Sequence, residues 1–425
     1  MVFSSIIFLL YFLPLVLVVN YLVPNKYRNY WLLIASLFFY AWGAPKFLFV
    51  LMGSIFANFW LVKQMHLSLS KSLKKFLLSL SVLINVALLV YFKYFNFFIE
   101  NINQLIQSAG GVSITWAKIL LPIGISFFTF QSLTYTVDVF RKIHQPLKKW
   151  SDYALYIMLF PQMIAGPIVR FSTIANQIIE RKTSTTAFKQ GLVRFIIGLS
   201  KKVLIANTLA QHSSENLVLN NVELNTTNAW VGILAYSFQI YFDFSGYSDM
   251  AIGIGKMLGF NFPENFNNPY NSKSITEFWR RWHITLGTWM RDYLYIPLGG
   301  NRVKTKGRLY FNLFFVFLIS GLWHGASWNF VIWGAYHGFF LVIERLFLSR
   351  LIQRLPSILA LIYAFFVVVI GWVFFSIESF ETAINYVKIL FSFNFKIEDF
   401  IIDRKVLFTL VLALFFSTIG LFRVG

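Results

Sequence analysis

Cysteine is absent from the 425 residues of the chain, which excludes disulfide bonds, thiolate catalysis and cysteine-bound metals. Charged residues are also scarce, at 13%, about half the share of an ordinary soluble domain. Acidic residues are rarer than basic ones, with 17 Asp and Glu against 37 Lys and Arg. The resulting net charge of +20 does not require a nucleic acid, because cytoplasmic loops of membrane proteins collect Lys and Arg.

Hydrophobic residues make up 57% of the chain and aromatic residues 20%. The charges lie between apolar stretches long enough to cross a bilayer, which takes about 20 residues per helix. No repeat or polar linker divides these stretches. We therefore expect an all-α polytopic membrane protein with a single membrane-embedded domain over residues 1–425, and no binding of nucleic acid.

The apolar runs predict about ten or eleven passes. They cover residues 2–23, 30–62 with a break at Gly43–Pro45, 77–98, 119–140, 186–211, 229–258, 308–345, 356–377 and 406–422. Run 2–23 has no basic residue before it and no cleavage pattern after it, so a membrane helix is favoured over a signal peptide. Lys26 and Arg28 follow, which places the N-terminus outside.

Two apolar stretches are interrupted. Residues 152–172 contain Pro161, Gly166 and Pro167 and have basic neighbours on both sides, which favours a re-entrant or broken helix. Such backbone is tolerated at membrane depth only inside protein or a watery cavity. Lys201 and Lys202 interrupt the run at 186–211.

Polar side chains gather in SFQIYFDFSGYSDMAIGIG, residues 237–255. Asp243, Ser245 and Asp249 lie here, and intramembrane carboxylates are costly unless they face a cavity or a partner. Two interpretations stay open. The carboxylates either pair with basic residues on a neighbouring helix or serve a function in a cavity.

The segment at 261–307 is basic, polar and aromatic, and we predict that it lies on the cytoplasmic side of the interface. Ser274 and Glu277 have capping-box spacing, so a helix is expected to begin there. On that helix Trp279 and His283 would stand one turn apart, with an apolar side formed by Trp282, Thr285, Leu286 and Trp289. Arg280, Arg281 and Arg291 supply positive charge, and on an interfacial amphipathic helix they would contact anionic lipid.

Residues 321–338, GLWHGASWNFVIWGAYHG, place His324 and His337 among three tryptophans. On a continuous helix they would be about 20 Å apart, and neither has a carboxylate neighbour, so a metal site is disfavoured. The chain has no G-x-S-x-G elbow for a serine hydrolase. Packing in the core and general-base catalysis by a neutral imidazole remain as interpretations.

Four stretches together carry a family resemblance: MVFSS, YFDFSGYSDMAIG, FWRRWHITLGTWMRDYLYIPLGG and GLWHGASWNFVIWGAYHG. Taken together and in this order they resemble the membrane-bound O-acyltransferase (MBOAT) superfamily, whereas any one of them alone would be a weak signal. Within it they are most similar to the AlgI-like branch, which is associated with O-acetylation of alginate, peptidoglycan and other bacterial polysaccharides. The resemblance covers residues 1 to about 345. The branch that transfers D-alanine to teichoic acid ranks second.

The resemblance implies a ring of helices, with re-entrant and interfacial helices, around a central tunnel. It identifies His324 and His283 as the catalytic histidines, the former as general base and the latter near the donor, where it either assists proton movement or holds the thioester carbonyl. Trp279, Arg280, Arg281 and Arg291 are candidates for donor binding. The residues expected to line the tunnel or to be structural are Asp243, Ser245, Asp249, Trp323, Asn329 and His337.

The implied reaction moves an acetyl group from a cytoplasmic thioester, with acetyl-CoA as donor, to a hydroxyl of an external polysaccharide. We expect no bound cofactor and no metal, a location in the bacterial cytoplasmic (inner) membrane, and an external SGNH-type partner protein. Three alternatives remain: D-alanyl transfer to teichoic acid, a transporter or flippase with Asp243 and Asp249 as proton relay, and a structural subunit of an export complex.

The charge pattern predicts the topology of five loops. Reporter tags at 66–75, 142–150 and 300–307 should be cytoplasmic, while tags at 103–112 and 214–227 should be external. An external 300–307 would contradict the arrangement, because Trp279 to Arg302 would then face away from a cytoplasmic donor.

Overall fold

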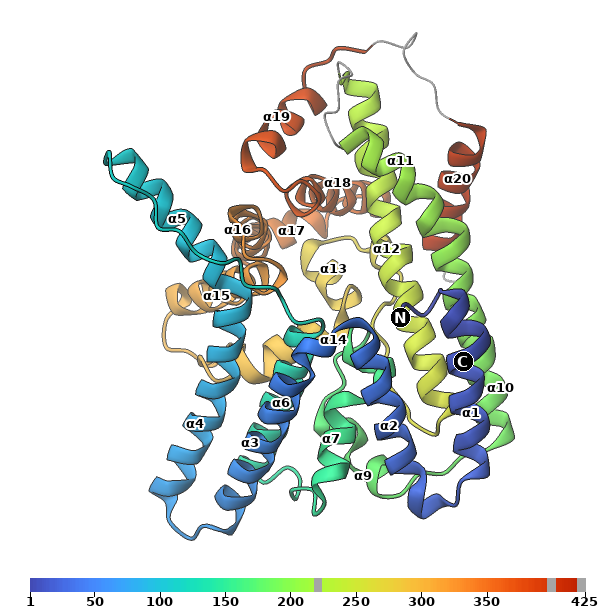
Figure 1. Ribbon diagram of the computed structural model, residues 1–425. Coiled ribbons are helices and arrows are strands. Elements are labelled where there is room, and N and C mark those ends of the chain that lie inside the picture. The colour runs from blue at the N-terminus through green and yellow to red at the C-terminus, as the bar shows by residue number, and fades with distance from the viewer. Residues whose placement is uncertain (218–223, 396–402, 419–425) are drawn as a thin grey trace. The chain divides into compact units, whose positions relative to one another are not determined.

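The computed structural model describes residues 1–217, 224–395 and 403–418, and every regular element in these ranges is a helix (Figure 1). The chain divides into two compact units. The first comprises Met1–Phe195 with Met250–Pro263, and the second Ile196–Asp249 with Glu264–Gly425. The predicted all-α fold is confirmed, while the single domain over residues 1–425 stays a prediction.

The first unit contains the N-terminal helices, most of α10 and the end of α12. Their bounds are η1 (Phe8–Phe12), α1 (Leu13–Leu22), α2 (Asn25–Gly43), η2 (Pro45–Phe47), α3 (Leu48–Leu67), α4 (Lys71–Leu89), η3 (Val90–Tyr94), α5 (Phe95–Ser108), α6 (Ile125–Phe140), α7 (Trp150–Met158), α8 (Phe160–Met163), α9 (Phe171–Ile179), α10 (Thr185–Ser200) and α12 (Thr226–Met257). The predicted break at Gly43–Pro45 is confirmed, since α2 ends at Gly43 and Pro45 opens a short 3-10 turn.

Buried polar side chains join α3, α4 and α6. The Asn58 Oδ1 atom accepts hydrogen bonds from Ser81 Oγ at 2.6 Å and from Asn85 Nδ2 at 2.7 Å, and Ser81 Oγ lies 3.0 Å from Thr136 Oγ1. In lipid-exposed helices, hydrogen bonds of this kind hold neighbours together at fixed rotations.

Two predicted boundaries in this unit are wrong. The helix expected at 119–140 begins at Ile125, because Pro122 lacks an N–H and Gly124 adopts a left-handed φ of 75°. The helix expected at 77–98 continues through α5 to Ser108, and α5 extends from the end of α4 (Figure 1). Residues 100–108 therefore belong to a helix.

The broken helix expected at 152–172 is confirmed. α7 ends at Met158 and α8 begins at Phe160, and the residues between 153 and 160 are fully buried. Side chains supply partners for the freed backbone: Phe160 N–H donates to Ser36 Oγ at 3.1 Å, and Tyr156 O–H donates to the Val169 carbonyl at 3.1 Å. The break is thus surrounded by protein, as non-helical backbone at membrane depth requires.

The second unit contains the remaining helices. Their bounds are η4 (Lys201–Ala206), α11 (Asn207–Leu217), most of α12, η5 (Pro269–Asn271), α13 (Ile275–Arg281), α14 (Ile284–Met290), η6 (Arg291–Tyr295), α15 (Lys306–His324), α16 (Trp328–Ile343), η7 (Glu344–Leu348), α17 (Ser349–Ile352), α18 (Ser357–Ser376), α19 (Phe380–Leu390) and α20 (Arg404–Thr418). The interruption at Lys201 and Lys202 appears as the π-helical turn η4. Part of the stretch expected outside, 218–223, lies beyond the described residues.

The predicted apolar block at 308–345 is the helix pair α15 and α16, which lie side by side (Figure 1). Gly321 on α15 faces Gly334 on α16. A Cβ atom on Gly321 would collide with the Phe330 carbonyl oxygen and lie 2.9 Å from Gly334 Cα. Because neither residue has a side chain, the two backbones approach closely, and this contact sets the position of the last turn of α15.

Four helical stretches among the described residues are long and apolar enough to cross a membrane. They are Pro45–Leu67, Lys71–Ser108, Trp328–Ile352 and Ser357–Ser376. The chain is therefore a polytopic membrane protein, as its sequence predicts, and the count of ten or eleven passes stays a prediction.

The glycine contact can be tested by adding one methyl group. Gly321→Ala should lower the stability of the detergent-solubilised protein by about 1–3 kcal/mol, the usual cost of overpacking, and thermal unfolding would measure the loss. Gly307→Ala is the matched control on the same helix, because a Cβ atom there meets nothing within 4 Å. Equal unfolding temperatures for the two variants would contradict the close packing.

Candidate active site

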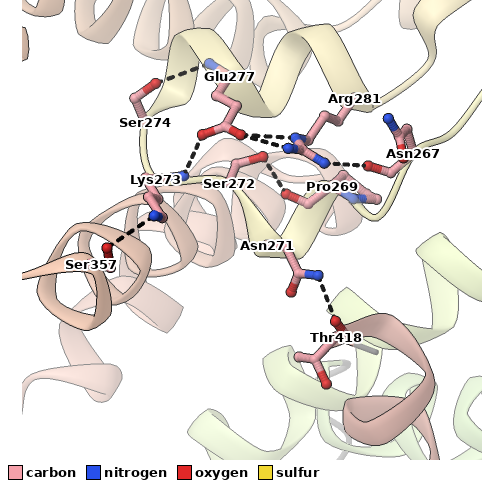
Figure 2. Close-up of polar contacts among 10 residues, drawn as sticks. All are labelled: Asn267, Pro269, Asn271, Ser272, Lys273, Ser274, Glu277, Arg281, Ser357 and Thr418. Atoms are coloured by element: carbon pink, nitrogen blue, oxygen red, sulfur yellow. Dashed lines mark hydrogen bonds and ion pairs between the residues drawn. The ribbon is translucent and has the colours of Figure 1, made fainter. Parts of the chain in front are cut away.

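The helix predicted to begin at Ser274 does begin there. Ser274 Oγ accepts a hydrogen bond from Glu277 N–H at 3.0 Å, and Glu277 Oε2 accepts one from Lys273 N–H at 2.9 Å (Figure 2). Glu277 Oε1 also pairs with Arg281 Nη2 at 2.8 Å, and Arg281 Nη1 donates to the Asn267 carbonyl at 3.2 Å. The side chain of Arg281 is thereby engaged in holding α13 to the preceding segment.

The continuous helix expected through Trp279 and His283 is wrong. α13 ends at Arg281, and His283 adopts the left-handed conformation, with φ 44° and ψ 53°, before α14 begins. The physical reason is competition for the backbone, since Ile284 N–H donates to the Asn265 carbonyl at 2.9 Å and Asn267 N–H donates to the Arg281 carbonyl at 2.9 Å. Trp279 therefore lies on α13, whereas His283 lies in the break just before α14.

His283 is 6% exposed, and its ring has one polar and one aromatic neighbour. Its Nδ1 atom lies 3.0 Å from Asn265 Oδ1, and the edge of its ring packs against Phe244 at 4.7 Å between centroids. Burial, and to a smaller extent the nearby His324, lowers the pKa of His283 well below that of a free imidazole. The side chain is therefore neutral at physiological pH.

His324 is the last residue of α15, just before Gly325 leaves the helical conformation. It is half-buried, and its ring contacts the edges of Trp333 at 5.1 Å and Phe375 at 5.2 Å between centroids. Its position follows from the Gly321 contact one turn earlier, which brings the end of α15 against α16.

One cavity of about 600 Å³ brings these two histidines together. It lies between the α13–α14 region and α15, and most of its wall is apolar. Its wall includes Trp279, Arg280, His283, Arg291, Ser320 and His324. The size suits a flexible arm or an acyl group, and the two imidazoles are the groups able to exchange protons with such a ligand.

The three candidate arginines divide into two groups. Arg280 and Arg291 are exposed and line the cavity, although Arg291 Nε also pairs with Asp292 Oδ1 at 2.7 Å. Arg281 does not line the cavity and is held by Glu277 instead. Only Arg280 and Arg291 are therefore placed to meet an anionic part of a ligand.

His337 is fully buried in α16, outside the cavity. Its ring packs against Trp279 at 4.9 Å and Trp333 at 5.1 Å, and a Cβ atom on Gly371 would lie 2.6 Å from its Nε2 atom. Neither ring nitrogen has a hydrogen-bond partner among the described residues. The contacts of His337 are those of a packed aromatic side chain.

The candidate carboxylates of α12 have basic partners. Asp249 pairs with Lys201 at 2.7 Å in a buried contact, and Asp243 pairs with Lys202 at 2.8 Å. Both lysines belong to the π-helical turn η4, so the sequence interruption and the intramembrane carboxylates form one structural feature. These pairs favour the first of the two interpretations, interhelical bonding with a basic partner.

The remaining candidates lie outside the cavity. Ser245 is buried and its hydroxyl has no partner in the described part of the chain. Asn329 is buried and its side-chain amide donates to the Ile377 carbonyl, while Trp323 is half-buried. Within the described ranges, no three histidine or acidic side chains gather in a way that could hold a metal ion.

Sequence reasoning missed two residues of the site. Ser320 lies on the cavity wall one turn before His324, a spacing of four that could have identified it. Asn265, which contacts His283, lies 18 residues before it in the chain in an irregular segment. No periodicity connects Asn265 to the site, because the tertiary fold alone brings the two together.

The chain is similar to a family of known proteins and to individual members of it. Residues 34–384 match the membrane-bound O-acyltransferase family. The chain is 46% identical over 93% of its length to the probable alginate O-acetylase AlgI of Pseudomonas aeruginosa, of which 75% is covered. It is 38% identical over 93% of its length to the peptidoglycan O-acetyltransferase of Helicobacter pylori, covering 80% of that protein.

A further relative is more distant. The teichoic acid D-alanyltransferase of Bacillus subtilis is 30% identical over 61% of this chain and 69% of its own length. The family match spans both histidines of the cavity and the helix pair that carries His324. The chain therefore belongs to the membrane-bound O-acyltransferase family and is an enzyme that transfers an acyl group to a hydroxyl oxygen.

Proposed function

We propose that this enzyme transfers an acetyl group from a cytoplasmic thioester, with acetyl-CoA as donor, to a hydroxyl of an external bacterial polysaccharide or cell-wall polymer. The observation that carries the proposal is the presence of His283 and His324 on the wall of one largely apolar cavity. The names of the alginate and peptidoglycan relatives support an acetyl group and a polymer acceptor.

In the proposed step, His324 is the general base. Its imidazole takes the proton from the acceptor hydroxyl while that oxygen attacks the thioester carbonyl carbon. The carbon–sulfur bond then breaks, and the departing thiolate takes the proton back from the imidazolium to leave as a thiol. The products are an O-acetyl ester and the free thiol of the donor, so atoms and charge balance.

The surroundings of His324 suit this role. The C-terminal end of a helix carries a partial negative charge, which favours a cation beside it. His324 ends α15 and is only half-buried, so the helix end and the remaining solvent exposure favour the imidazolium formed by proton uptake. His283 is more deeply buried and lacks this advantage.

Arg280 and Arg291 are proposed to hold the phosphates of the donor nucleotide, since guanidinium groups form paired hydrogen bonds with phosphate oxygens. Trp279 and the apolar wall would contact the thioester arm. The enzyme is proposed to lie in the bacterial cytoplasmic membrane with its N-terminus outside. An external SGNH-type protein is proposed to receive or forward the acetyl group. The choice of polysaccharide would then belong to that partner.

Substitution of the histidines tests the mechanism. His324→Ala should fold yet lose acetyl transfer by about two to four orders of magnitude, the usual scale for a general base. His324→Gln should do no better, because an amide does not accept the proton. His283→Ala should be strongly impaired but retain some turnover. The measurement is acetyl transfer per folded molecule, with monodispersity checked for each variant.

His337 supplies the comparison. His337→Ala should lower stability by about 2 kcal/mol or more through the space it leaves. His337→Leu should recover much of that stability and keep activity, because the ring nitrogens make no hydrogen bond to the described residues. Near-normal transfer by His324→Ala would refute the assignment of the base. A folded but inactive His337→Leu would show that the chemistry belongs to His337.

Donor recognition is tested at the arginines. The double variant Arg280→Gln, Arg291→Gln should raise the KM for acetyl-CoA about tenfold and lower kcat less, as expected for lost charge-assisted hydrogen bonds. A short acetyl thioester without the nucleotide should be used equally by variant and wild type. Arg281→Gln is the matched control, because Arg281 lies outside the cavity and its KM should stay unchanged. Parallel loss of both donors in the double variant would assign these arginines to the fold or the membrane surface.

The donor specificity separates acetyl from D-alanyl transfer. Supplying purified enzyme with acetyl and D-alanyl thioesters in parallel should give consumption of the acetyl donor. Preference for the D-alanyl donor would move the enzyme to the teichoic acid branch, and consumption of neither would favour a transporter.

A further inference from the structure

We propose that Asn265 is a positioning residue that holds His283 in the tautomer with its proton on Nδ1, so that Nε2 offers a lone pair to the cavity. His283 then acts as an acceptor of protons or hydrogen bonds and does not hold the thioester carbonyl. The kinetic part of this role rests on the proposed acyl transfer, whereas the tautomer does not.

The orientation of the Asn265 amide follows from its neighbours. Thr285 N–H lies 3.3 Å from Asn265 Oδ1, and a backbone N–H can only donate, so the atom facing it is the oxygen. Thr285 Oγ1 donates to the same oxygen at 2.8 Å. On the other side Asn265 Nδ2 donates to Ser248 Oγ at 3.0 Å. The amide is 1% exposed, so water does not compete with these contacts.

The orientation of the amide determines the protonation of the imidazole. Asn265 Oδ1 accepts but cannot donate, so the His283 Nδ1 atom 3.0 Å away carries a hydrogen. A neutral imidazole has one N–H, which leaves Nε2 unprotonated. Among the described residues the hydrogen bond of the His283 ring is the one at Nδ1, and His283 lines the cavity. A bare nitrogen cannot donate to a carbonyl oxygen, so of the two roles expected for His283, proton movement fits.

Asn265 also holds the backbone at His283. His283 has φ 44°, a left-handed conformation that is unfavourable for a residue with a side chain. Asn265 supports it twice, through its carbonyl to Ile284 N–H at 2.9 Å and through its side chain to Thr285 N–H. Strained backbone of this kind persists only where its surroundings impose it, and it is common at active sites.

Other charged and titratable groups near His283 belong to the elements packed around it. His324 on α15, Arg280 on α13, and Arg291 and Tyr295 on η6 line the same cavity. On α12, Asp243 and Asp249 are paired with Lys202 and Lys201. The uncharged Asn265 is thus the only group bonded to the His283 ring in the described part of the chain, and a charge introduced there acts on the imidazole directly.

The tautomer can be observed in the wild-type protein. In protein labelled with ¹⁵N-histidine and solubilised in detergent, the NMR signals of His283, identified by their loss in His283→Gln, should show a protonated Nδ1 and an unprotonated Nε2 near pH 7. A proton on Nε2 would overturn the proposal. The experiment needs no substrate, so its result is independent of the proposed function.

Asn265→Asp provides the kinetic test. A carboxylate beside Nδ1 keeps the same tautomer but favours the imidazolium, so the pKa of His283 rises. Because the reaction requires neutral His283, lowering the pH should inactivate the variant at a higher pH than it inactivates the wild type. The NMR titration of His283 should move upward by at least about one pH unit, and the acidic limb of the kcat/KM profile should move upward with it while the alkaline plateau is largely retained. An unmoved limb together with an unmoved NMR titration of His283 would overturn the role.

Two variants separate positioning from general structure. Asn265→Ala removes the acceptor and should lower kcat/KM about 10- to 100-fold, the scale of lost outer-shell partners, with a mixture of His283 tautomers in the NMR spectrum. Ser248→Ala removes a partner of Asn265 that does not touch the imidazole, so it should leave both the tautomer and the acidic limb in place. A limb that moves equally in Ser248→Ala would assign the network to the fold. Absence of acyl transfer by the wild type would refute the proposed function and leave the NMR result standing.

Discussion

Backbone groups released at a helix break must find partners within the protein, because the membrane interior and a packed core offer no water. This constraint governs the break at His283, where Asn265 accepts hydrogen bonds from the N–H groups of Ile284 and Thr285. A continuous helix would have bonded these groups within itself. The same residue reaches the His283 ring. The groups that permit the break are therefore also the groups that orient the imidazole, and the site depends on this one segment.

The second histidine is positioned by packing instead of hydrogen bonding. Gly321 and Gly334 let α15 and α16 approach until their backbones touch, and His324 follows one turn after Gly321. Once α15 is in place, the ring of His324 contacts Trp333 and Phe375, and His324 lines the cavity. The two histidines thus reach one cavity by different physical means, one through a polar network and the other through close contact of small residues.

Their surroundings also differ in what charge they tolerate. His283 is almost fully buried, with its polar contact limited to a neutral amide, so its charged form is disfavoured. His324 stands at the negative end of a helix and is half-buried. A pair of imidazoles with unequal tolerance for a proton suits a reaction in which one group takes the proton and gives it back. His337 has neither an opening nor a polar partner among the described residues, and its contacts are those of core packing.

Composition and periodicity were sufficient to predict an all-α membrane protein, the break at Gly43–Pro45, the interrupted helix near Pro161 and the cap at Ser274, because each depends on residues close together in the chain. Four stretches in their order along the chain, the one around His324 among them, were sufficient to identify the family. The break at His283 escaped prediction, since residues 274–290 have helical periodicity and the competing partner, Asn265, lies outside that window. The separation of Arg281 from Arg280 and Arg291 was equally hidden, because all three are cations on one short segment and only the fold turns Arg281 toward Glu277 and Asn267. Local sequence determined that the chain forms membrane-spanning helices and where several of them begin or break. Contacts between distant segments decided which side chains share the cavity, because those contacts form only when the helices pack.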